Sequence, residues 1–327
     1  MTSTMKAALR GESGLVFAEV PSPLAGPDDV LARVRAVALN RADLGVLAGR
    51  MHGSAGGTGT VLGMEWAGEV VAVGAAVTGL APGDRVMGFA GGAFAEFVRA
   101  DRGRVLPMPP GMGFEQAASL PVALMTMHDA VAVNGRLRAG ESVLVLGASS
   151  GVGLMAMRIA RHLGARCVIG TSTDPSRRAR LAEFGADVAI DTADPGWPER
   201  VREATAGNGV ELIVDQLAGP TVAGSLVAAA IRGRIVNVGR LAGMTGSIDF
   251  DLHALKRIDY VGVTFRTRSV DEVRELSRRM WADLEPAVAD GTLSLPVSEV
   301  YPFAALGDAF AAMAANRHFG KIVVTLG

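Results

Sequence analysis

The pattern of apolar and polar positions changes along the chain. Up to about residue 106, segments such as VLARVRAVAL (residues 30–39) and AGEVVAVG (67–74) partly alternate apolar residues with polar or small ones. This period of two is typical of strands that bury one face. Turn-forming groups such as LAPGD separate the segments. The pattern therefore predicts a β-rich N-terminal region.

From about residue 143 the apolar residues gather into short continuous runs. Six of them, VLVLG, CVIG, VAI, LIVD, IVNVG and YVGVTF, alternate with spans of helical periodicity. This alternation predicts an α/β domain built on a doubly wound parallel sheet. One helix is expected to end at Gly185, because glycine is the usual helix stop. A long helix is expected over residues 270–290, and a last helix and strand near the C-terminus.

Length and composition restrict the class of protein. A chain of 327 residues favours two domains over a single core. Apolar residues make up 49%, charged residues 20%, and the formal net charge is −1 without a block of like charges. Nucleic acid and anionic membrane surfaces are therefore not expected as partners. The start of the chain does not resemble a signal peptide, and we expect a cytoplasmic protein.

The residues that usually bind metals are few and scattered. Cys167 is the single cysteine, which excludes an intrachain disulfide and a cysteine-rich zinc lobe. The five histidines, at positions 52, 128, 162, 253 and 318, show no short spacing typical of zinc ligands. We expect no bound metal.

A turn of small residues, GASSGVG (147–153), follows the first apolar run. A strand precedes it and a helix follows, and a helix N-terminus offers free amides and a partial positive charge to phosphate groups. Ala148 and Ser150 replace the first two glycines of the G-x-G-x-x-G fingerprint, so the prediction depends on this context. An unliganded tight turn is the alternative. We predict that a dinucleotide pyrophosphate binds at Ser149, Ser150, Gly151, Val152 and Gly153.

The end of the second apolar run indicates which dinucleotide binds. Sites that prefer NAD usually carry an acid about 20 residues after the last glycine. Nineteen residues after Gly153 stands the neutral Ser172. The hydroxyl groups of Ser172 and Thr173 and the guanidinium of Arg177 can bind a 2′-phosphate, which predicts NADP(H). Asp174 is a rival acid, although its TDPS setting favours a helix cap, and Arg177 on a solvated helix face is the alternative to a phosphate ligand.

Several further motifs resemble the zinc-free quinone oxidoreductase (zeta-crystallin-like) branch of the medium-chain dehydrogenase/reductases. They include ALNRADL (38–44), VLGMEWAGEVVAVG (61–74), ASLPVALMTMHDAV (118–131) and HFGKIVV (318–324). The resemblance covers nearly the whole chain. It implies a GroES-like catalytic domain made of residues 1–120 and 269–327, with a Rossmann NADP(H)-binding domain at residues 121–268 inserted between them.

The resemblance also implies the location of the reaction. Asn40 matches an asparagine that lies near the nicotinamide in quinone reductases. Zinc-containing members carry a cysteine where Asn40 stands and a histidine where Met64 precedes Glu65, so no catalytic zinc is implied. The other positions implied in the cofactor site are Thr126, Asn237, Val238, Gly239, Asn316, His318, Gly320 and Lys321.

A metal-free cleft suits an acceptor that is already electrophilic, because no Lewis acid would stabilise an alkoxide. We therefore predict hydride transfer from NADPH to a quinone or to the C=C bond of an α,β-unsaturated carbonyl compound. Asn40 and backbone amides are candidates to bind the enolate oxygen, and Arg41 is a weaker candidate. No side chain stands out as the proton donor. His52 is the best-placed candidate, an exposed loop histidine is the preferred interpretation, and water could supply the proton instead. Asp43 is interpreted as a helix cap.

Two other functions stay open at this point. One is a non-catalytic NADPH-binding protein similar to a crystallin, and the other is a zinc-type alcohol dehydrogenase, which the missing ligands oppose. A homodimer is expected from the resemblance, with a small-molecule substrate as the other partner.

Overall fold

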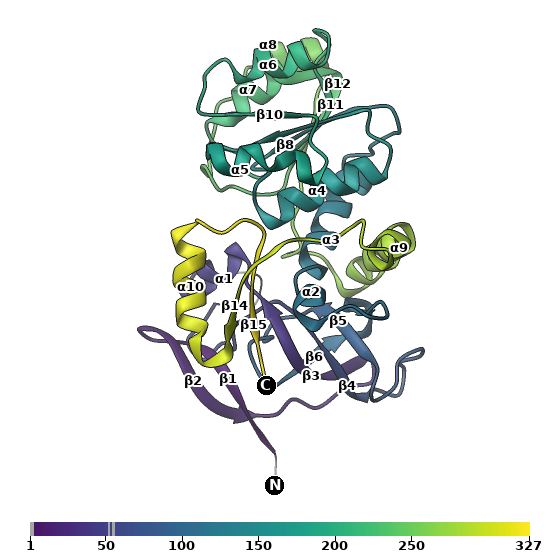
Figure 1. Cartoon of the computed structure of the whole chain (residues 1–327), viewed down its shortest axis with the longest axis vertical. Coiled ribbons are helices and arrows are strands. Elements are labelled where there is room, and N and C mark those ends of the chain that lie inside the picture. Colours follow the sequence, from purple (N-terminus) through teal and green to yellow (C-terminus); the bar gives the residue numbers. More distant parts are fainter. Residues whose placement is uncertain (1–2, 52, 54–55) are drawn as a thin grey trace. The chain divides into compact units, whose positions relative to one another are not determined.

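The computed structural model describes residues 3–51, 53 and 56–327. It divides the chain into two compact units (Figure 1). The first comprises Met1–Val122, Phe265–Ala289 and Ser294–Gly327, and the second comprises Ala123–Thr264 and Asp290–Leu293. The expected boundaries after residues 120 and 268 lie two and four residues away from these, and residues 290–293 join the second unit. Over the described ranges, no helix is both long and apolar enough to cross a membrane.

The first unit is β-rich, and its described residues form a seven-stranded sheet beside a two-stranded ribbon. The order of the sheet is β14–β15–β3–β4–β5–β7, with β6 paired to β3, and β1 pairs with β2. The segments at 30–39 and 67–74 form β3 and β4, as predicted. The bounds are β1 (Thr4–Gly11), β2 (Gly14–Pro21), β3 (Asp29–Ala38), β4 (Glu65–Val73), β5 (Arg85–Phe89), β6 (Phe97–Asp101), β7 (Val105–Pro107), β14 (Val297–Pro302) and β15 (Lys321–Thr325).

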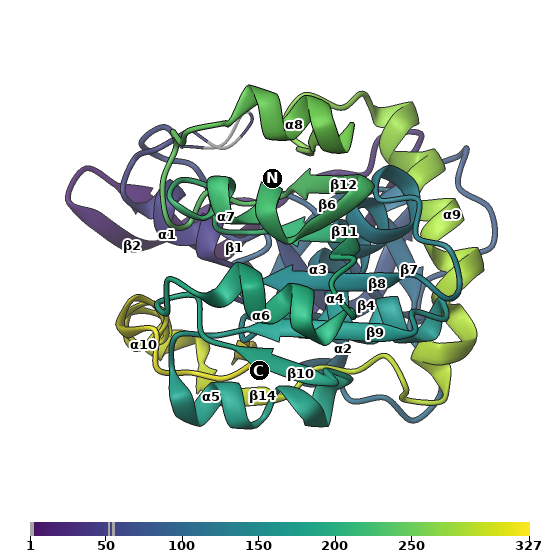
Figure 2. The same ribbon diagram turned by 90° about the horizontal axis from the view of Figure 1, so that it is seen from above.

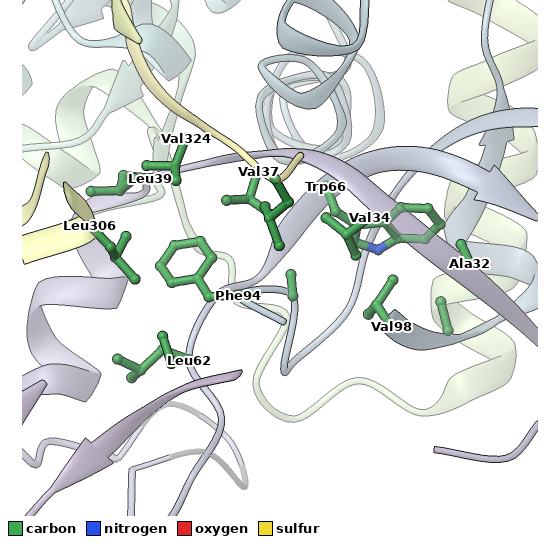
Figure 3. Packing of buried hydrophobic residues seen from close by; sticks show 14 of the residues in the cluster. Ala32, Val34, Val37, Leu39, Leu62, Trp66, Phe94, Val98, Leu306 and Val324 are labelled. Atoms are coloured by element: carbon green, nitrogen blue, oxygen red, sulfur yellow. The ribbon is translucent and has the colours of Figure 1, made fainter. Parts of the chain in front are cut away.

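Alternation along β3 builds the core of the first unit. Val30, Ala32 and Val34 are buried, and the residues between them are partly or fully exposed. They pack with the fully buried Trp66 and Phe94, as Figure 3 shows for part of this cluster. The helix α10 (Leu306–Ala315) contributes Leu306 and Phe310 to the same cluster. Period-two patterning is thus realised as one buried sheet face.

The register of this sheet determines which residues meet where β3 ends and its two neighbours begin. β3 pairs antiparallel with β15 through Ala38 and Val323, and with β4 through Val37 and Trp66. The C-terminal end of β3 therefore lies beside the first residues of both neighbours. Asn40 follows β3, and α1 (Arg41–Leu47) begins directly after it. Asn40, Glu65 and Lys321 consequently lie at neighbouring ends of the three adjacent strands β3, β4 and β15.

The second unit contains a parallel sheet, and its described strands follow the order β10–β9–β8–β11–β12–β13. Figure 2 shows its central strands running side by side. All six predicted apolar runs become strands of this sheet, so the α/β fold class is confirmed. The chain reverses direction across the sheet between β8 and β11, which makes their carboxyl ends a topological switch point. The bounds are β8 (Ser142–Leu146), β9 (Cys167–Thr171), β10 (Val188–Ile190), β11 (Val210–Asp215), β12 (Ala229–Asn237) and β13 (Asp259–Gly262).

The helices mostly follow the predicted limits. The helix expected to end at Gly185 is split into α5 (Pro175–Ala179) and a 3-10 helix (Leu181–Phe184), and Gly185 does end it with φ +95°. The predicted long helix is α9 (Val270–Ala289). The remaining α-helices are α2 (Phe114–Ala118), α3 (Pro121–His128), α4 (Gly151–His162), α6 (Trp197–Ala204), α7 (Thr221–Ala228) and α8 (Phe250–Lys256).

Candidate functional site

The glycine turn joins β8 to α4 at the switch point of the second unit. Gly147 has φ +73°, which favours glycine. A Cβ atom on Gly153 would lie 2.6 Å from the Gly147 carbonyl oxygen and 2.7 Å from the Ala148 Cα. Only glycine therefore lets the first turn of α4 pass this close to the loop. This is the role of the third glycine in the dinucleotide fingerprint.

The N-terminus of α4 is arranged to receive an anion. The Ser150 Oγ accepts a hydrogen bond of 3.1 Å from the Gly153 amide, so Ser150 caps the helix. The amides of Gly151 and Val152 have no acceptor within the helix. They lie at the positive end of a 12-residue helix dipole, where a phosphate is stabilised. The residues present therefore fit a dinucleotide pyrophosphate.

Gln216, which the sequence did not single out, holds the turn in place. It follows β11 and is 2% exposed. Its Nε2 donates to the Leu146 carbonyl oxygen at 3.1 Å, and its Oε1 accepts from the Ser150 Oγ at 3.0 Å. Gln216 thus connects the ends of β8 and β11 across the switch point. The segment DQLAG carries no motif, and only the strand order reveals this role.

Ser172 lies at the end of β9, beside the turn. It is 6% exposed, and its Oγ donates to the Ser149 Oγ at 3.1 Å. Two of the three serines predicted in the cofactor site are therefore brought together. Thr173 is exposed. No acidic side chain stands at position 172, so the strand end presents hydroxyl groups where an NAD-preferring site presents a carboxylate.

Two arginines near Ser172 lie beside carboxylates, and the place of Arg177 in the cofactor site stays a prediction. The Arg177 Nε lies 3.5 Å from the Asp174 carboxylate, whereas Arg178 donates to the Ser172 carbonyl oxygen at 2.8 Å and to Asp191 at 2.9 Å. The Asp174 carboxylate also accepts from the Arg177 amide at 2.9 Å, which confirms Asp174 as the cap of α5. Hydrogen bonds from Ser176 and Arg177 lower the pKa of Asp174 to about 2.

Asn237, Val238 and Gly239 occupy the same edge of the parallel sheet. The Val238 amide donates to the Asp215 carbonyl oxygen at 2.7 Å, and the Asn237 Nδ2 donates to the Gly239 carbonyl oxygen at 3.0 Å. Asp215 is buried, which raises the pKa of its carboxyl group despite hydrogen bonds from Leu217 and Ala218. By accepting hydrogen bonds from these two amides, the Asp215 side chain holds the first residues of the loop after β11.

Thr126 is the remaining predicted cofactor-site residue of the second unit. It lies on α3 and is half-buried. Its place in the cofactor site stays a prediction.

A buried polar cluster surrounds Asn40 in the first unit. The Asn40 Oδ1 accepts a hydrogen bond of 3.0 Å from the Lys321 Nζ, and its Nδ2 donates to the Glu65 Oε1 at 2.8 Å. Lys321 and Glu65 form an ion pair, with side chains 5% and 0% exposed. The Glu65 Oε2 accepts from the Val122 amide at 3.0 Å. Asn40 and Lys321 were both predicted in the site, whereas Glu65 was not assigned a role there.

Asp43 belongs to the same cluster. Its carboxylate accepts from the Asn40 amide at 2.7 Å, so Asp43 takes part in capping α1 as the third residue of a capping box, while the N-cap itself is Asn40. Burial raises the pKa of Asp43 from 3.8 to about 7, and the nearby Glu65 adds to the increase. The hydrogen bond from Asn40 and the charge of Lys321 oppose it.

The other predicted residues of the first unit lie around α10. Arg41 donates to the Met313 carbonyl oxygen at 3.3 Å and to the Asn316 Oδ1 at 2.5 Å. Asn316 ends α10 with φ +54°, His318 is half-buried, and Gly320 has φ +97° directly before Lys321. His52, the candidate proton donor, lies outside the described residues.

The cluster does not fit a metal ion. In the described part of the chain, no three His, Cys, Asp or Glu side chains converge as ligands. Asn40 and Glu65 instead meet the ammonium group of Lys321, which is a donor without a lone pair. A second cation would be repelled by this group.

Comparisons with known proteins match both units to described families. Residues 151–282 match the zinc-binding dehydrogenase family, and residues 26–110 match the alcohol dehydrogenase GroES-like domain. The first unit is therefore GroES-like, and the second has the Rossmann-like sheet.

Curated relatives include two large synthases. The chain is 32% identical over 301 residues to the phthioceranic/hydroxyphthioceranic acid synthase of Mycobacterium tuberculosis, covering 91% of this chain and 14% of the synthase. It is 35% identical over 312 residues to the pikromycin polyketide synthase component PikAII of Streptomyces venezuelae, covering 94% of this chain and 8% of that protein. The chain thus spans a small fraction of the length of these relatives.

Solved structures match along almost the whole chain. A probable oxidoreductase from Mycobacterium abscessus is 31% identical, with a TM-score of 0.85 and 100% of both chains covered. The mycobacterial protein Rv1454c complexed with NADPH and a mycobacterial quinone oxidoreductase are each 27% identical, with TM-scores of 0.86 and 0.87. Each of these two matches covers 98% of this chain and 100% of the other.

Proposed function

This chain belongs to the medium-chain dehydrogenase/reductase superfamily of oxidoreductases, and from that premise we propose that it uses NADPH, without a metal, to reduce a quinone or the C=C bond of an α,β-unsaturated carbonyl compound. The observation that carries the proposal is the glycine turn at the switch point, with the neutral Ser172 hydroxyl beside it. The NADPH complex of a structural relative supports the same cofactor.

The residues of the second unit would hold NADP(H) in stated ways. The amides of Gly151 and Val152 would bind the pyrophosphate. The hydroxyl groups of Ser172 and Thr173, with the guanidinium of Arg177, would bind the 2′-phosphate. When bound, NADPH supplies the hydride, and the protein contributes orientation and electrostatics.

The cluster around Asn40 supports an acceptor that is already electrophilic. Lys321 satisfies both Asn40 and Glu65, so this group of residues provides no metal Lewis acid to stabilise an alkoxide. Addition of hydride to the β-carbon of an enone produces an enolate, whose oxygen needs hydrogen-bond donors rather than a metal. We assign this role to the Asn40 carboxamide. A quinone, the acceptor named for one structural relative, makes the same demand.

Isotope transfer tests the reaction. With NADPH deuterated at the transferred position, the enone product should carry deuterium at the β-carbon, and its α-hydrogen should come from the solvent. A panel of quinones, enals, enones and simple ketones should show turnover of the conjugated acceptors and poor turnover of the ketones. Tight NADPH binding without turnover of any acceptor would instead favour a non-catalytic NADPH-binding protein.

We also propose that the protein is a homodimer. Strand β13 is at one end of the parallel sheet, and an edge strand offers unpaired backbone groups to a second copy. Light scattering should then give a mass of twice 33.7 kDa. A mass of one chain at micromolar concentration would contradict this.

A further inference from the structure

The cluster around Asn40 allows a more specific assignment, which rests on the proposed function. We propose that Lys321 and Glu65 are positioning residues that hold the Asn40 carboxamide in one orientation, and that Lys321 polarises it toward the reacting substrate. They would act through Asn40 rather than by touching the substrate.

Chemistry determines which way the Asn40 amide points. Asparagine oxygen and nitrogen atoms are distinguished only by their hydrogen-bond partners. The Lys321 ammonium only donates, so the atom 3.0 Å from it must be Oδ1. The Glu65 carboxylate only accepts, so the atom 2.8 Å from it must be Nδ2. A flipped amide would place two donors together and two acceptors together.

The two partners are themselves held by the fold. Glu65 is fully buried at the first residue of β4 and accepts from the Val122 amide through its other oxygen. Lys321 is 4% exposed at the first residue of β15, and Gly320 before it has φ +97°. Asn40 is also held through its backbone by Asp43. The amide therefore has little freedom to rotate.

This arrangement leaves a defined donor for the substrate. Among the described residues, the bond to Glu65 uses one of the two Nδ2–H groups of Asn40, and the bond from Lys321 uses Oδ1. The Lys321 cation at Oδ1 withdraws electron density from the amide, which strengthens the second N–H as a donor, whereas the Glu65 carboxylate at the first N–H acts in the opposite sense and fixes the orientation. Such a donor stabilises negative charge that develops on a carbonyl oxygen. Asn40 is half-buried, so part of its surface stays accessible.

The orientation can be measured without activity. The protein has five asparagines, and selective 15N labelling with an Asn40→Ala reference identifies the side-chain amide signal of Asn40. In the unmodified protein this amide should exchange slowly with solvent, and exchange should accelerate at least about tenfold in Lys321→Met. Glu69→Gln is the matched control, because Glu69 lies on the same strand and pairs with Arg35 at 2.8 Å instead. An unchanged Asn40 signal in Lys321→Met would overturn the proposal.

A double-variant cycle tests the consequence for catalysis. Lys321→Met should lower kcat by about tenfold to a hundredfold while the KM for the acceptor changes by less than about threefold. Lys321→Arg should restore most of this loss, because it keeps the charge and the donor. Combining Lys321→Met with Asn40→Ala should cost no more than Asn40→Ala alone. Additive losses, or a large increase in the Kd of NADPH, would show that Lys321 acts independently of Asn40 and overturn the proposal.

Failure to fold and failure of the proposed reaction can each be told apart from failure of the positioning role. Lys321→Met leaves the Glu65 carboxylate buried without its partner, so it can fail to fold. In that case Glu65→Gln combined with Lys321→Met removes both charges and the donor to the Asn40 Oδ1 together, and the same amide exchange and kcat changes are expected of it. If the unmodified protein reduces no acceptor but its Asn40 amide is ordered through Lys321, the proposed reaction fails while the positioning role holds.

Discussion

Asp43 shows how one residue can serve the site at a cost in stability. It is 1% exposed, it caps α1 through the Asn40 amide, and it shares its surroundings with a second carboxylate, Glu65. Burial is the main reason that the pKa of Asp43 rises to about 7. A carboxyl group with a raised pKa in the folded state destabilises the fold once it must ionise.

Asp43→Asn should therefore stabilise the protein at alkaline pH. Between about pH 4 and pH 7 the unfolded chain releases the Asp43 proton while the folded protein keeps it, so the free energy of unfolding falls as pH rises. The difference between 3.8 and about 7 sets an upper limit of about 4 kcal/mol on this loss. The variant keeps an oxygen acceptor for the Asn40 amide. Urea unfolding should show it to be about 1–4 kcal/mol more stable at pH 8 and nearly equal at pH 4. Equal stability at both pH values would contradict a raised pKa.

Ser172 is the residue that we expect to decide between NADPH and NADH. Ser172→Asp would place a carboxylate beside Ser149, where the 2′-phosphate is expected. Like-charge repulsion should reduce kcat/KM for NADPH by at least about tenfold and change kcat/KM for NADH much less. Arg180→Ala is the control, since Arg180 pairs with Glu183 on the same segment. Comparable kcat/KM for both cofactors in the unmodified protein would defeat the assignment.

The shape of the turn between β8 and α4 depends on Gly153 having no side chain. An ideal Cβ atom on Gly153 would lie 2.6 Å from the Gly147 carbonyl oxygen. Gln216 and Ser150 fasten the same turn from the neighbouring strand end. The loop cannot move away from an added methyl group without breaking these bonds.

Gly153→Ala should consequently disturb the turn and its ligand together. We expect a loss of about 1–3 kcal/mol in the free energy of unfolding, because the added methyl group overpacks the contact. NADPH should bind at least about tenfold more weakly, as measured by fluorescence titration, because the amides of the helix N-terminus are displaced. Gly91→Ala is the control, because a Cβ there meets nothing within 4 Å. Unchanged NADPH affinity in Gly153→Ala would show that the turn does not bind the pyrophosphate.

For the molecule as a whole, the family match raises the question whether this protein binds zinc. The second unit matches a family described as zinc-binding dehydrogenases, yet Lys321 closes the polar cluster of the first unit with its own positive charge. The two statements agree if this chain is a member of the superfamily that works without zinc.

Metal analysis tests this directly. Protein purified without a metal-binding tag should contain no stoichiometric zinc by elemental analysis, and a chelator should leave the activity unchanged. Glu65 and Asn40 would bind zinc only if the Lys321 ammonium were displaced. Activity lost to a chelator and restored by zinc would overturn the proposal of a metal-independent enzyme.

Local sequence was sufficient where a structure depends on residues a few positions apart. The alternation along β3, the six apolar runs of the parallel sheet and the caps at Asp43 and Asp174 were all predicted, because each follows from short-range periodicity or a single turn. The glycine turn was recognised for the same reason. His52 lies outside the described residues, and its role stays a prediction.

Tertiary structure decided the contacts between distant segments. Lys321 meets Glu65 across 256 positions, and Gln216 meets Ser150 across 66 positions, although neither pair forms a motif. The first contact requires β15 and β4 to flank β3 in a particular register, and the second requires β11 to lie beside β8. Strand order and register follow from how whole sheet faces pack, which a local pattern does not contain. The sequence alone therefore predicted Asn40 and the glycine turn as parts of the site, and the packing of the sheets determined which buried side chains contact them.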